Sequence, residues 1–130
     1  MSIWKNNSAE ETKPWGSVIH FPSPFGMNGK IIHIEAGKRN SLKYYHNTNQ
    51  CLYCLSGSVK VEAPREFEFG DEIDPKHGAT FWLKPGSLIL IQAGDPYRIT
   101  AFEDSVLVEV LLGGSKREYV MLEDDFGRVR

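Results

Sequence analysis

Four polar residues that could support acid–base or binding chemistry lie in two stretches of the sequence that are marked by glycines. Gly37 and Gly57 enclose Lys43, Tyr45 and Gln50, and Tyr97 follows Gly86 and Gly94. Lys43 and Tyr45 are two residues apart, so their side chains share one face of a strand. Burial lowers the pKa of a lysine, and a nearby ammonium lowers that of a phenol, which suits the pair to proton transfer. The same groups can also bind a polar ligand, or form a hydrogen-bonded plug that fills the interior.

The elements that position these residues are short β-like runs separated by Gly, Pro and Asn turns. We expect strands at residues 17–21, 30–36, 41–46, 51–55, 59–62, 80–83, 87–91, 97–102 and 105–112. No window shows a clear helical period, and residues 118–124 form at most a short C-terminal turn. Eight or nine short strands without crossover helices predict an all-β, antiparallel sandwich or barrel.

The 130 residues fit a single domain, which we divide into an N-terminal arm (1–12) and a barrel (13–130). Residues 63–78 interrupt the rhythm of short strands with a long charged segment. The alternation of Phe67 and Phe69 with glutamates suggests an extra strand, used as a lid or a dimer arm. The plainer interpretation is a solvated excursion without a role.

Composition excludes several function classes. A net charge of −2 does not suit a nucleic-acid partner, and no apolar run reaches the ~20 residues that span a membrane. The polar, acidic start does not have the features of a signal peptide, so we expect a cytoplasmic protein. Cys51 and Cys54 fall on opposite faces of the expected strand, which favours reduced structural thiols over a redox or zinc pair.

The glycine spacing resembles the cupin superfamily, whose two motifs read G-x5-H-x-H-x3,4-E-x6-G and G-x5-P-x-G-x2-H. Three further landmarks are K-P-W-G at 13–16, R-N-S-L-K-Y at 39–44 and L-E-D-D-F-G-R at 122–128. Together they resemble the cupin domain of type II mannose-6-phosphate isomerases, which is often fused to a mannose-1-phosphate guanylyltransferase. The resemblance covers nearly the whole chain. It implies a single-domain antiparallel double-stranded β-helix, or jelly-roll barrel, and phosphomannose isomerisation as the activity of the family.

The metal-binding positions of the resemblance are replaced. Where cupins usually carry three His and one Glu, this chain has Lys43, Tyr45, Gln50 and Tyr97. An ammonium repels a divalent cation, and a phenol ligates only after losing its proton. We therefore expect no metal and no other cofactor, and the metal-dependent isomerase activity is not carried over.

The four histidines are interpreted without a ligand role. A one-residue register slip would turn His46 inward as a rescue ligand, but the glycine spacing favours an exposed or locally bonded His46. His33 is one polar position in an apolar strand, His77 lies in the long segment, and His20 is expected at the surface.

Three functions remain open. The first is a metal-independent module that binds a sugar, sugar phosphate, nucleotide sugar or similar polar molecule through Arg39, Lys43, Tyr45, Gln50 and Tyr97, with Arg98 nearby. The second is a metal-independent sugar isomerase or epimerase that uses Tyr97 with Lys43 or His46. The third is a structural or regulatory cupin with a filled barrel. We rank them in that order. We also expect a homodimer, in which residues 1–15, with Trp4 and Trp15, pack across a partner or across their own barrel.

Overall fold

The computed structural model describes residues 3–21, 28–64, 70–74, 76, 78–112 and 119–128. All regular elements in these ranges are strands, as the short alternating runs predict. The described residues hold no helix with the length and apolar character needed to cross a membrane. The all-β prediction is therefore confirmed.

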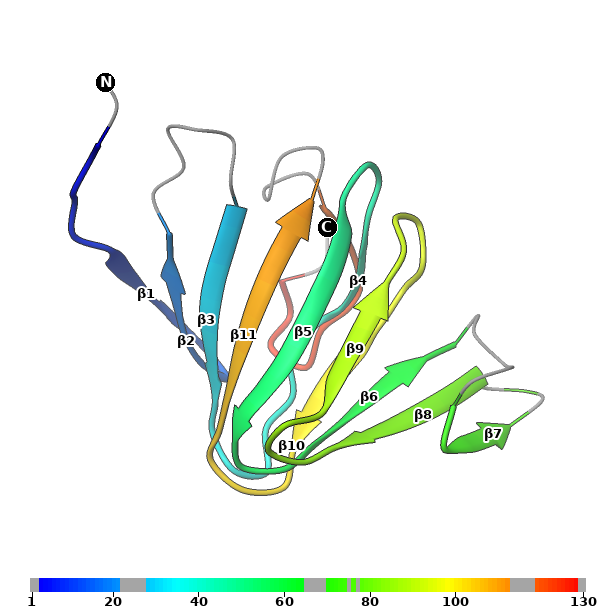
Figure 1. Cartoon of the computed structure of the whole chain (residues 1–130). Helices are drawn as coiled ribbons and strands as arrows, with labels where there is room; N and C mark the ends of the chain where they lie inside the picture. Colours follow the sequence, from blue (N-terminus) through cyan, green and yellow to red (C-terminus); the bar gives the residue numbers. More distant parts are fainter. Residues whose placement is uncertain are drawn as a thin grey trace.

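Nine of the twelve strands are those expected from the sequence (Figure 1). They are β2 (Gly16–His20), β3 (Asn28–Ile34), β4 (Leu42–Tyr45), β5 (Asn49–Ser56), β6 (Val59–Ala63), β8 (Gly78–Leu83), β9 (Leu88–Ile91), β10 (Arg98–Ala101) and β11 (Ser105–Leu112). Burial alternates along β11 from Ser105 to Leu112, which is the period of two that one buried sheet face requires.

Three strands were not expected. β1 (Ala9–Lys13) pairs antiparallel with β2 over its full length, so this part of the N-terminal segment extends the sheet of its own chain. β7 (Glu72–Asp74) is a short exposed strand against β8. β12 (Tyr119–Glu123) pairs with β4, so the expected C-terminal turn is wrong. The extra strand suggested at Phe67 and Phe69 lies outside the described residues.

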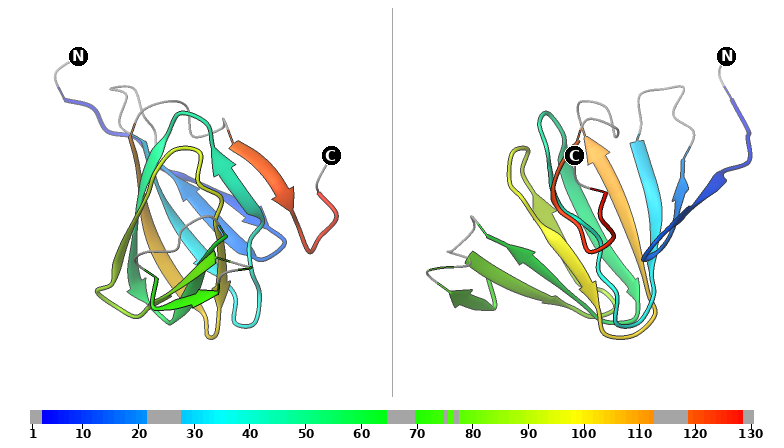
Figure 2. Two further views of the ribbon diagram at one scale, coloured as in Figure 1. Left: turned by 90° about the vertical axis from the view of Figure 1, so that its right-hand side faces the viewer. Right: turned by 180° about the vertical axis from the view of Figure 1, so that it is seen from behind.

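The strands form two antiparallel layers that face each other. One sheet has the order β1-β2-β3-β11-β5-β9 and the second has β10-β6-β8-β7, while β12 and β4 form a separate pair (Figure 1). The left view in Figure 2 shows β12, in orange-red, beside β4 at one side of the molecule. Large apolar side chains between the layers make one core, which includes Trp15, Ile34, Leu52, Ile99 and Leu107.

Backbone contacts bring the two glycine-marked stretches together. Lys43 and Tyr97 exchange backbone hydrogen bonds of 3.1 and 2.9 Å, which links β4 to the chain just before β10. The Gly94 amide donates to the Tyr45 carbonyl at 2.7 Å. The two glycine-marked stretches are therefore neighbours joined by backbone hydrogen bonds.

Two glycines are required by the backbone itself. Gly57 turns β5 into β6 with φ of 86°, a conformation that L-residues rarely adopt, and a Cβ there would meet Ser105. Gly16 starts β2 against β3, where a Cβ would collide with the His33 carbonyl oxygen. The first is part of the spaced motif and the second closes the K-P-W-G landmark, so both patterns have a steric origin.

Candidate ligand site

A hydrogen-bonded network occupies the barrel interior. Gln50 Nε2 donates to the Tyr97 hydroxyl at 2.6 Å and to Glu109 Oε1 at 2.7 Å. Lys30 Nζ donates to the Tyr45 hydroxyl at 3.0 Å and lies 3.9 Å from Glu109 Oε2. All five side chains are buried. Three of the predicted site residues, Tyr45, Gln50 and Tyr97, are thus joined through two residues that the sequence analysis did not select.

Glu109 and Lys30 could have been found from alternation alone. Glu109 occupies an inward position of an otherwise apolar strand, S-V-L-V-E-V-L-L, and is fully buried. Lys30 is an inward residue of β3, two residues before the buried Ile32. A charged residue at an inward strand position requires a partner, and these two provide it for each other.

The two tyrosines of the network stay protonated near neutral pH. Burial raises the pKa of Tyr45 above its usual value, and the Glu109 carboxylate adds to the effect. The pKa of Tyr97 is raised well above the usual range for the same two reasons. Neither phenol is therefore poised to accept a proton near pH 7.

The residues at the four positions compared with cupin metal ligands do not fit a divalent metal. No group of three or more His, Cys, Asp or Glu side chains within the described ranges is arranged to hold one. Among the described residues Glu109 Oε2 accepts no hydrogen bond, but the Lys30 ammonium 3.9 Å away supplies positive charge beside it. An ammonium at that place repels a second cation, so this protein's interior chemistry is that of a lysine–carboxylate pair.

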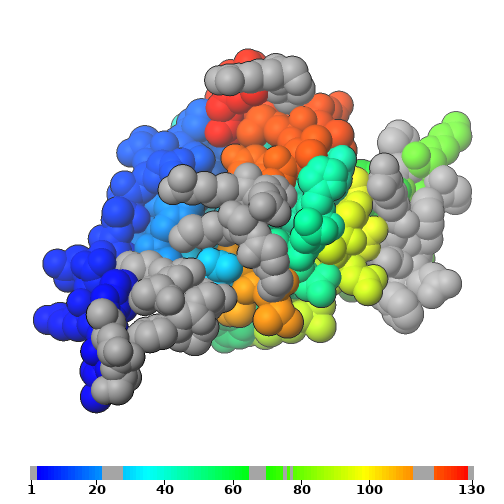
Figure 3. Space-filling view, turned by 90° about the horizontal axis from the view of Figure 1, so that it is seen from above, coloured from blue at the N-terminus to red at the C-terminus, as the bar shows by residue number. Residues whose placement is uncertain are grey.

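Lys43 departs from the network and lines a separate cavity. This cavity has a volume of about 570 Å³ and lies between the N-terminal strands β1 to β3 on one side and β4 with β12 on the other. In Figure 3, seen from above, the orange β12 segment lies between the blue N-terminal strands and the teal end of β4. The walls of the cavity include Lys13, Trp15, Lys43, Tyr119 and Arg128.

The Lys43 side chain has no polar partner among the described residues. It is only 8% exposed, and its Nζ lies 5.2 Å from the centre of the Tyr119 ring. Its pKa is lowered from 10.5 to about 7, mainly by burial and to a smaller extent by the positive charge of Lys30. A nearly buried amine that faces a cavity without a partner is a candidate ligand contact.

Charge around the cavity is predominantly positive. Four cationic side chains line it, Lys13, Lys30, Lys43 and Arg128, against the two acids Glu10 and Glu11. Lys13 forms an ion pair with Glu11. Arg128 binds Asp124 through two nitrogens at 3.0 and 2.9 Å, and this hydrogen bonding lowers the pKa of Asp124 to about 2. Lys43 is therefore the cation left to meet an incoming anion.

The three sequence landmarks converge on this cavity. The first contributes Lys13 and Trp15, the second contributes Asn40, Ser41 and Lys43, and the third contributes Arg128. These residues are far apart in the chain. The pairing of β4 with β12 brings the second and third landmarks together, and the hairpin of β1 and β2 carries the first to the same cavity.

Arg39 and Arg98 do not line the cavity. Arg39 forms two hydrogen bonds with Asp125, at 2.6 and 2.8 Å, and its side chain is partly exposed. Buried Arg98 donates to the Asn40 carbonyl at 2.8 Å and to Asp125 Oδ1 at 2.9 Å. Both guanidinium groups hold the C-terminal segment, so the structure separates them from Lys43 rather than placing them around it.

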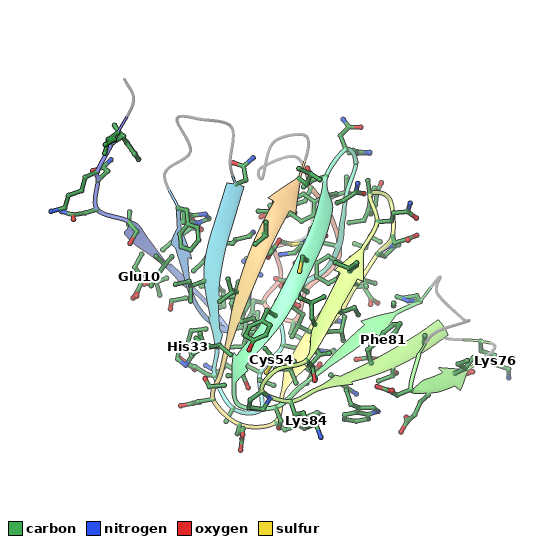
Figure 4. The ribbon with its side chains drawn as sticks, viewed as in Figure 1. Glu10, His33, Cys54, Lys76, Phe81 and Lys84 are labelled. Carbon is green, nitrogen blue, oxygen red and sulfur yellow. The ribbon has the colours of Figure 1, made fainter. Side chains whose placement is uncertain are left out.

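The four predicted interior side chains consequently do not share one pocket. Lys43 lines the polar cavity, and Gln50 lines a second cleft of about 570 Å³ whose walls come mostly from β5, β6, β8 and β9. Phe81 of β8, labelled in Figure 4, is one of several apolar side chains on that wall. Tyr45 and Tyr97 line neither space. The convergence expected from barrel geometry occurs at the network, and Lys43 is the exception.

The histidines and cysteines fall largely as predicted. His46 is exposed and contacts the Tyr44 ring edge-on, with ring centres 5.2 Å apart. Cys51 and Cys54 are both free, and Cys54, labelled in Figure 4, is buried on the opposite face from Cys51. His20 corrects the prediction of a surface residue, because it is half-buried on the cavity wall with Nε2 3.3 Å from Glu11. His77 lies outside the described residues.

Comparison with known proteins identifies similar structures. CapF, a capsular polysaccharide assembling protein from Staphylococcus aureus, superposes with a TM-score of 0.70 at 15% identity, over 92% of this chain and 33% of that one. This chain therefore spans about a third of the CapF length. KdgF from Halomonas sp. gives 0.66 at 13% identity, covering 86% and 89% of the two chains. Ectoine synthase from P. lautus gives 0.61 at 15% identity, covering 83% and 76%.

The sequence matches no family model and no curated protein. Identities of 13 to 15% show a shared fold and say nothing of shared activity. The facing antiparallel sheets, the interlocked glycine motifs and these structural neighbours show that the chain has the cupin fold.

Proposed function

We propose that this protein binds a small anionic, polyhydroxylated molecule of the sugar-phosphate class in the cavity between β1–β3 and β4–β12. The observation that carries the proposal is the Lys43 amine, which faces the cavity, is nearly buried and lacks a polar partner in the described structure. An anion at this place would supply the missing partner and restore the charged form of Lys43.

The lining suits a ligand with both charge and hydroxyl groups. Asn40 and Ser41 provide polar side chains, while Trp15 and Tyr119 provide aromatic surface against which a sugar can pack. The sequence resemblance to mannose-6-phosphate isomerase domains rests on landmarks that meet at this cavity, which supports a sugar phosphate as the ligand. The metal-dependent chemistry of that family does not follow, because the donor set is unsuitable.

An isomerase or epimerase that uses Tyr97 as its base is less well supported. Tyr97 is hydrogen-bonded to Gln50, and its pKa lies well above the usual range. Tyr45 is similarly engaged by Lys30. The polar-plug interpretation suits these interior residues, and the binding interpretation suits the cavity next to them.

The test is thermal unfolding with matched ligands. Mannose 6-phosphate and glycerol 3-phosphate should raise the melting temperature, and mannose and glycerol should raise it less, since only the phosphates supply an anion for Lys43. A ligand at 100 times its dissociation constant stabilises by about 2.7 kcal/mol. Trp15 fluorescence, measured with Trp4 and Trp82 changed to Phe, reports binding at the cavity independently of stability.

Two variants localise the effect. Lys43→Met should abolish the phosphate-dependent shift, and Lys84→Met should leave it intact, because Lys84 is exposed and lies outside the cavity lining (Figure 4). Equal responses of both variants to the phosphates, or no response of the unmodified protein to any of the four compounds, would contradict the proposed function.

A further inference from the structure

We propose that the cavity accepts an anionic compound carrying an aldehyde or ketone, and that the Lys43 amine forms an imine with its carbonyl carbon. This inference rests on the proposed function, since the anion must first bind in the same cavity. It adds a covalent step and narrows the ligand to open-chain oxo compounds, such as aldose or ketose phosphates.

Lys43 is set apart from the other cavity lysines by its contacts. Lys30 donates to Tyr45 and lies beside Glu109, and Lys13 is paired with Glu11, so each of these two amines already has a polar partner. Lys43 has no such contact within the described ranges, and its nitrogen lies against the Tyr119 ring. Its lone pair is therefore the one available for attack on an electrophile in the cavity.

The protonation state of Lys43 supports this role. An amine must be uncharged to act as a nucleophile, and a surface lysine with an ordinary pKa is almost entirely charged at pH 7. Burial, with the charge of Lys30, lowers the pKa of Lys43 to about 7, so a large fraction is uncharged at neutral pH. Lys13 and Arg128 line the same cavity, each beside an acidic partner, and their remaining N–H groups can donate to the anionic end of the ligand.

The step balances without a further reactant. The nitrogen lone pair of Lys43 forms a bond to the carbonyl carbon, and the C=O π pair moves to oxygen. One proton passes from the nitrogen to that oxygen and gives a carbinolamine. The second nitrogen proton then passes to the hydroxyl, which leaves as water with the C–O bonding pair, while the nitrogen lone pair forms the C=N double bond. No redox change occurs, and hydrolysis reverses the sequence. Because Lys43 is nearly buried, bulk water has little access to the imine once it has formed.

Reductive trapping tests the step. The protein is incubated with glyceraldehyde 3-phosphate and sodium cyanoborohydride, which delivers hydride to an imine carbon and fixes it as a secondary amine. Intact mass and peptide mapping should show one adduct per chain, at Lys43. Glycerol 3-phosphate, which lacks the carbonyl, should form no adduct and should protect Lys43 by competition.

Three variants separate covalent attachment from binding. Lys43→Met should lose the adduct, and Lys84→Met should retain it. Lys43→Arg keeps a cation but cannot form a stable imine, so it should still respond to glycerol 3-phosphate in thermal unfolding while forming no adduct. Phosphate-dependent stabilisation that requires Lys43, without any adduct at that residue, would overturn the imine and leave the binding function standing. Labelling spread over surface lysines and unchanged in Lys43→Met would also overturn it.

Discussion

At the scale of single residues, the contrast between Lys30 and Lys43 is the main feature of this protein. Both are buried, and both lie on inward positions of neighbouring parts of the fold. Lys30 is neutralised by Glu109 and bonded to Tyr45, whereas Lys43 faces a cavity. The contacts of Lys30 are those of a structural residue, whereas Lys43 is placed to contact a ligand.

The pKa of Lys43 predicts how stability varies with pH. Its folded value of about 7 lies below the usual 10.5, so between these values the unfolded chain binds more protons than the folded one. The free energy of unfolding should therefore rise with pH across this window. Chemical denaturation from pH 7 to pH 10 should show a rise in the unmodified protein that is smaller in Lys43→Met.

Lys43→Met should also be more stable than the unmodified protein at pH 7. Replacing buried ionic groups by hydrophobic residues of similar volume often stabilises by about 1–4 kcal/mol. The same substitution abolishes ligand-dependent stabilisation in our proposal, so a gain in stability with a loss of binding is the expected combination. A large loss of stability in Lys43→Met would indicate that Lys43 is a structural residue.

At the scale of elements, β12 completes the cavity. It pairs with the edge of β4, and its Tyr119 contacts the Tyr45 ring at 5.6 Å between centres. The segment after β12 is then fixed by Asp125, which accepts hydrogen bonds from Arg39 and Arg98. The last landmark of the sequence thus has a structural role, because it holds the cavity wall in place.

Asp125→Ala should loosen this wall. The hydrogen bond from Arg39, more than that from Arg98, lowers the pKa of Asp125, which indicates that the folded state favours its charged form. Because the Asp125 side chain is 40% exposed, water screens these pairs and the expected loss is about 1 kcal/mol. Denaturant unfolding measures the loss, and hydrogen exchange should accelerate at the β4 and β12 amides.

Glu103→Ala is the matched control, since Glu103 is exposed and its carboxylate forms no hydrogen bond or ion pair within the described chain. Unchanged exchange at β12 in Asp125→Ala, or the same acceleration in both variants, would argue against an anchoring role for Asp125.

At the scale of the whole molecule, the outer face of β9, β5 and β11 in the large sheet is apolar. Register places Leu90, Cys51 and Val110 in one row across β9, β5 and β11. The outward side chains on these strands that are most open to solvent are 38% to 73% exposed: Tyr53, Leu55, Leu88, Leu90, Val110 and Leu112. The outward positions of the three strands carry no charged residue. A monomer rarely leaves a patch of this kind uncovered.

We propose that a second copy of the chain covers this face in a symmetric homodimer. An uncharged apolar surface is compatible with a copy of itself, and a face three strands wide can supply the roughly 800 Å² per partner of a stable interface. Residues 9–13 pair with β2 of the same chain, so this described part of the N-terminal segment belongs to its own sheet.

Light scattering at micromolar concentration should give the mass of a dimer. Leu90→Lys and Val110→Lys should each shift it toward the monomer, because a charge would be buried at the interface without a partner. Leu122→Lys is the control, as Leu122 is exposed on β12 instead. A monomeric unmodified protein, or a dimer that persists in both interface variants, would contradict this arrangement.

Much of the architecture could be predicted from sequence because its causes are local. Alternation of apolar residues produced nine of the twelve strands, and spaced glycines such as Gly57 marked turns that other residues resist. The missed strands carry little alternation in burial: β1 and β7 are almost entirely exposed, and the first three residues of β12 are all half-buried. Each is a strand through its pairing with a neighbour, which local sequence does not reveal.

The sequence by itself determined which residue types stand at the spaced positions, since Lys43, Tyr45, Gln50 and Tyr97 can be read directly from it. Only the tertiary structure decided which of these four residues join the buried hydrogen-bonded network and which one faces the cavity. Glu109, 59 residues from Gln50 in the chain, joins Gln50 and Tyr97 to Lys30 and Tyr45. Lys43 remains outside that network because β12 and the N-terminal strands leave a cavity beside it. The sequence gives the residue types. Whether a buried charged residue has a partner depends on which strands become neighbours when the sheets form.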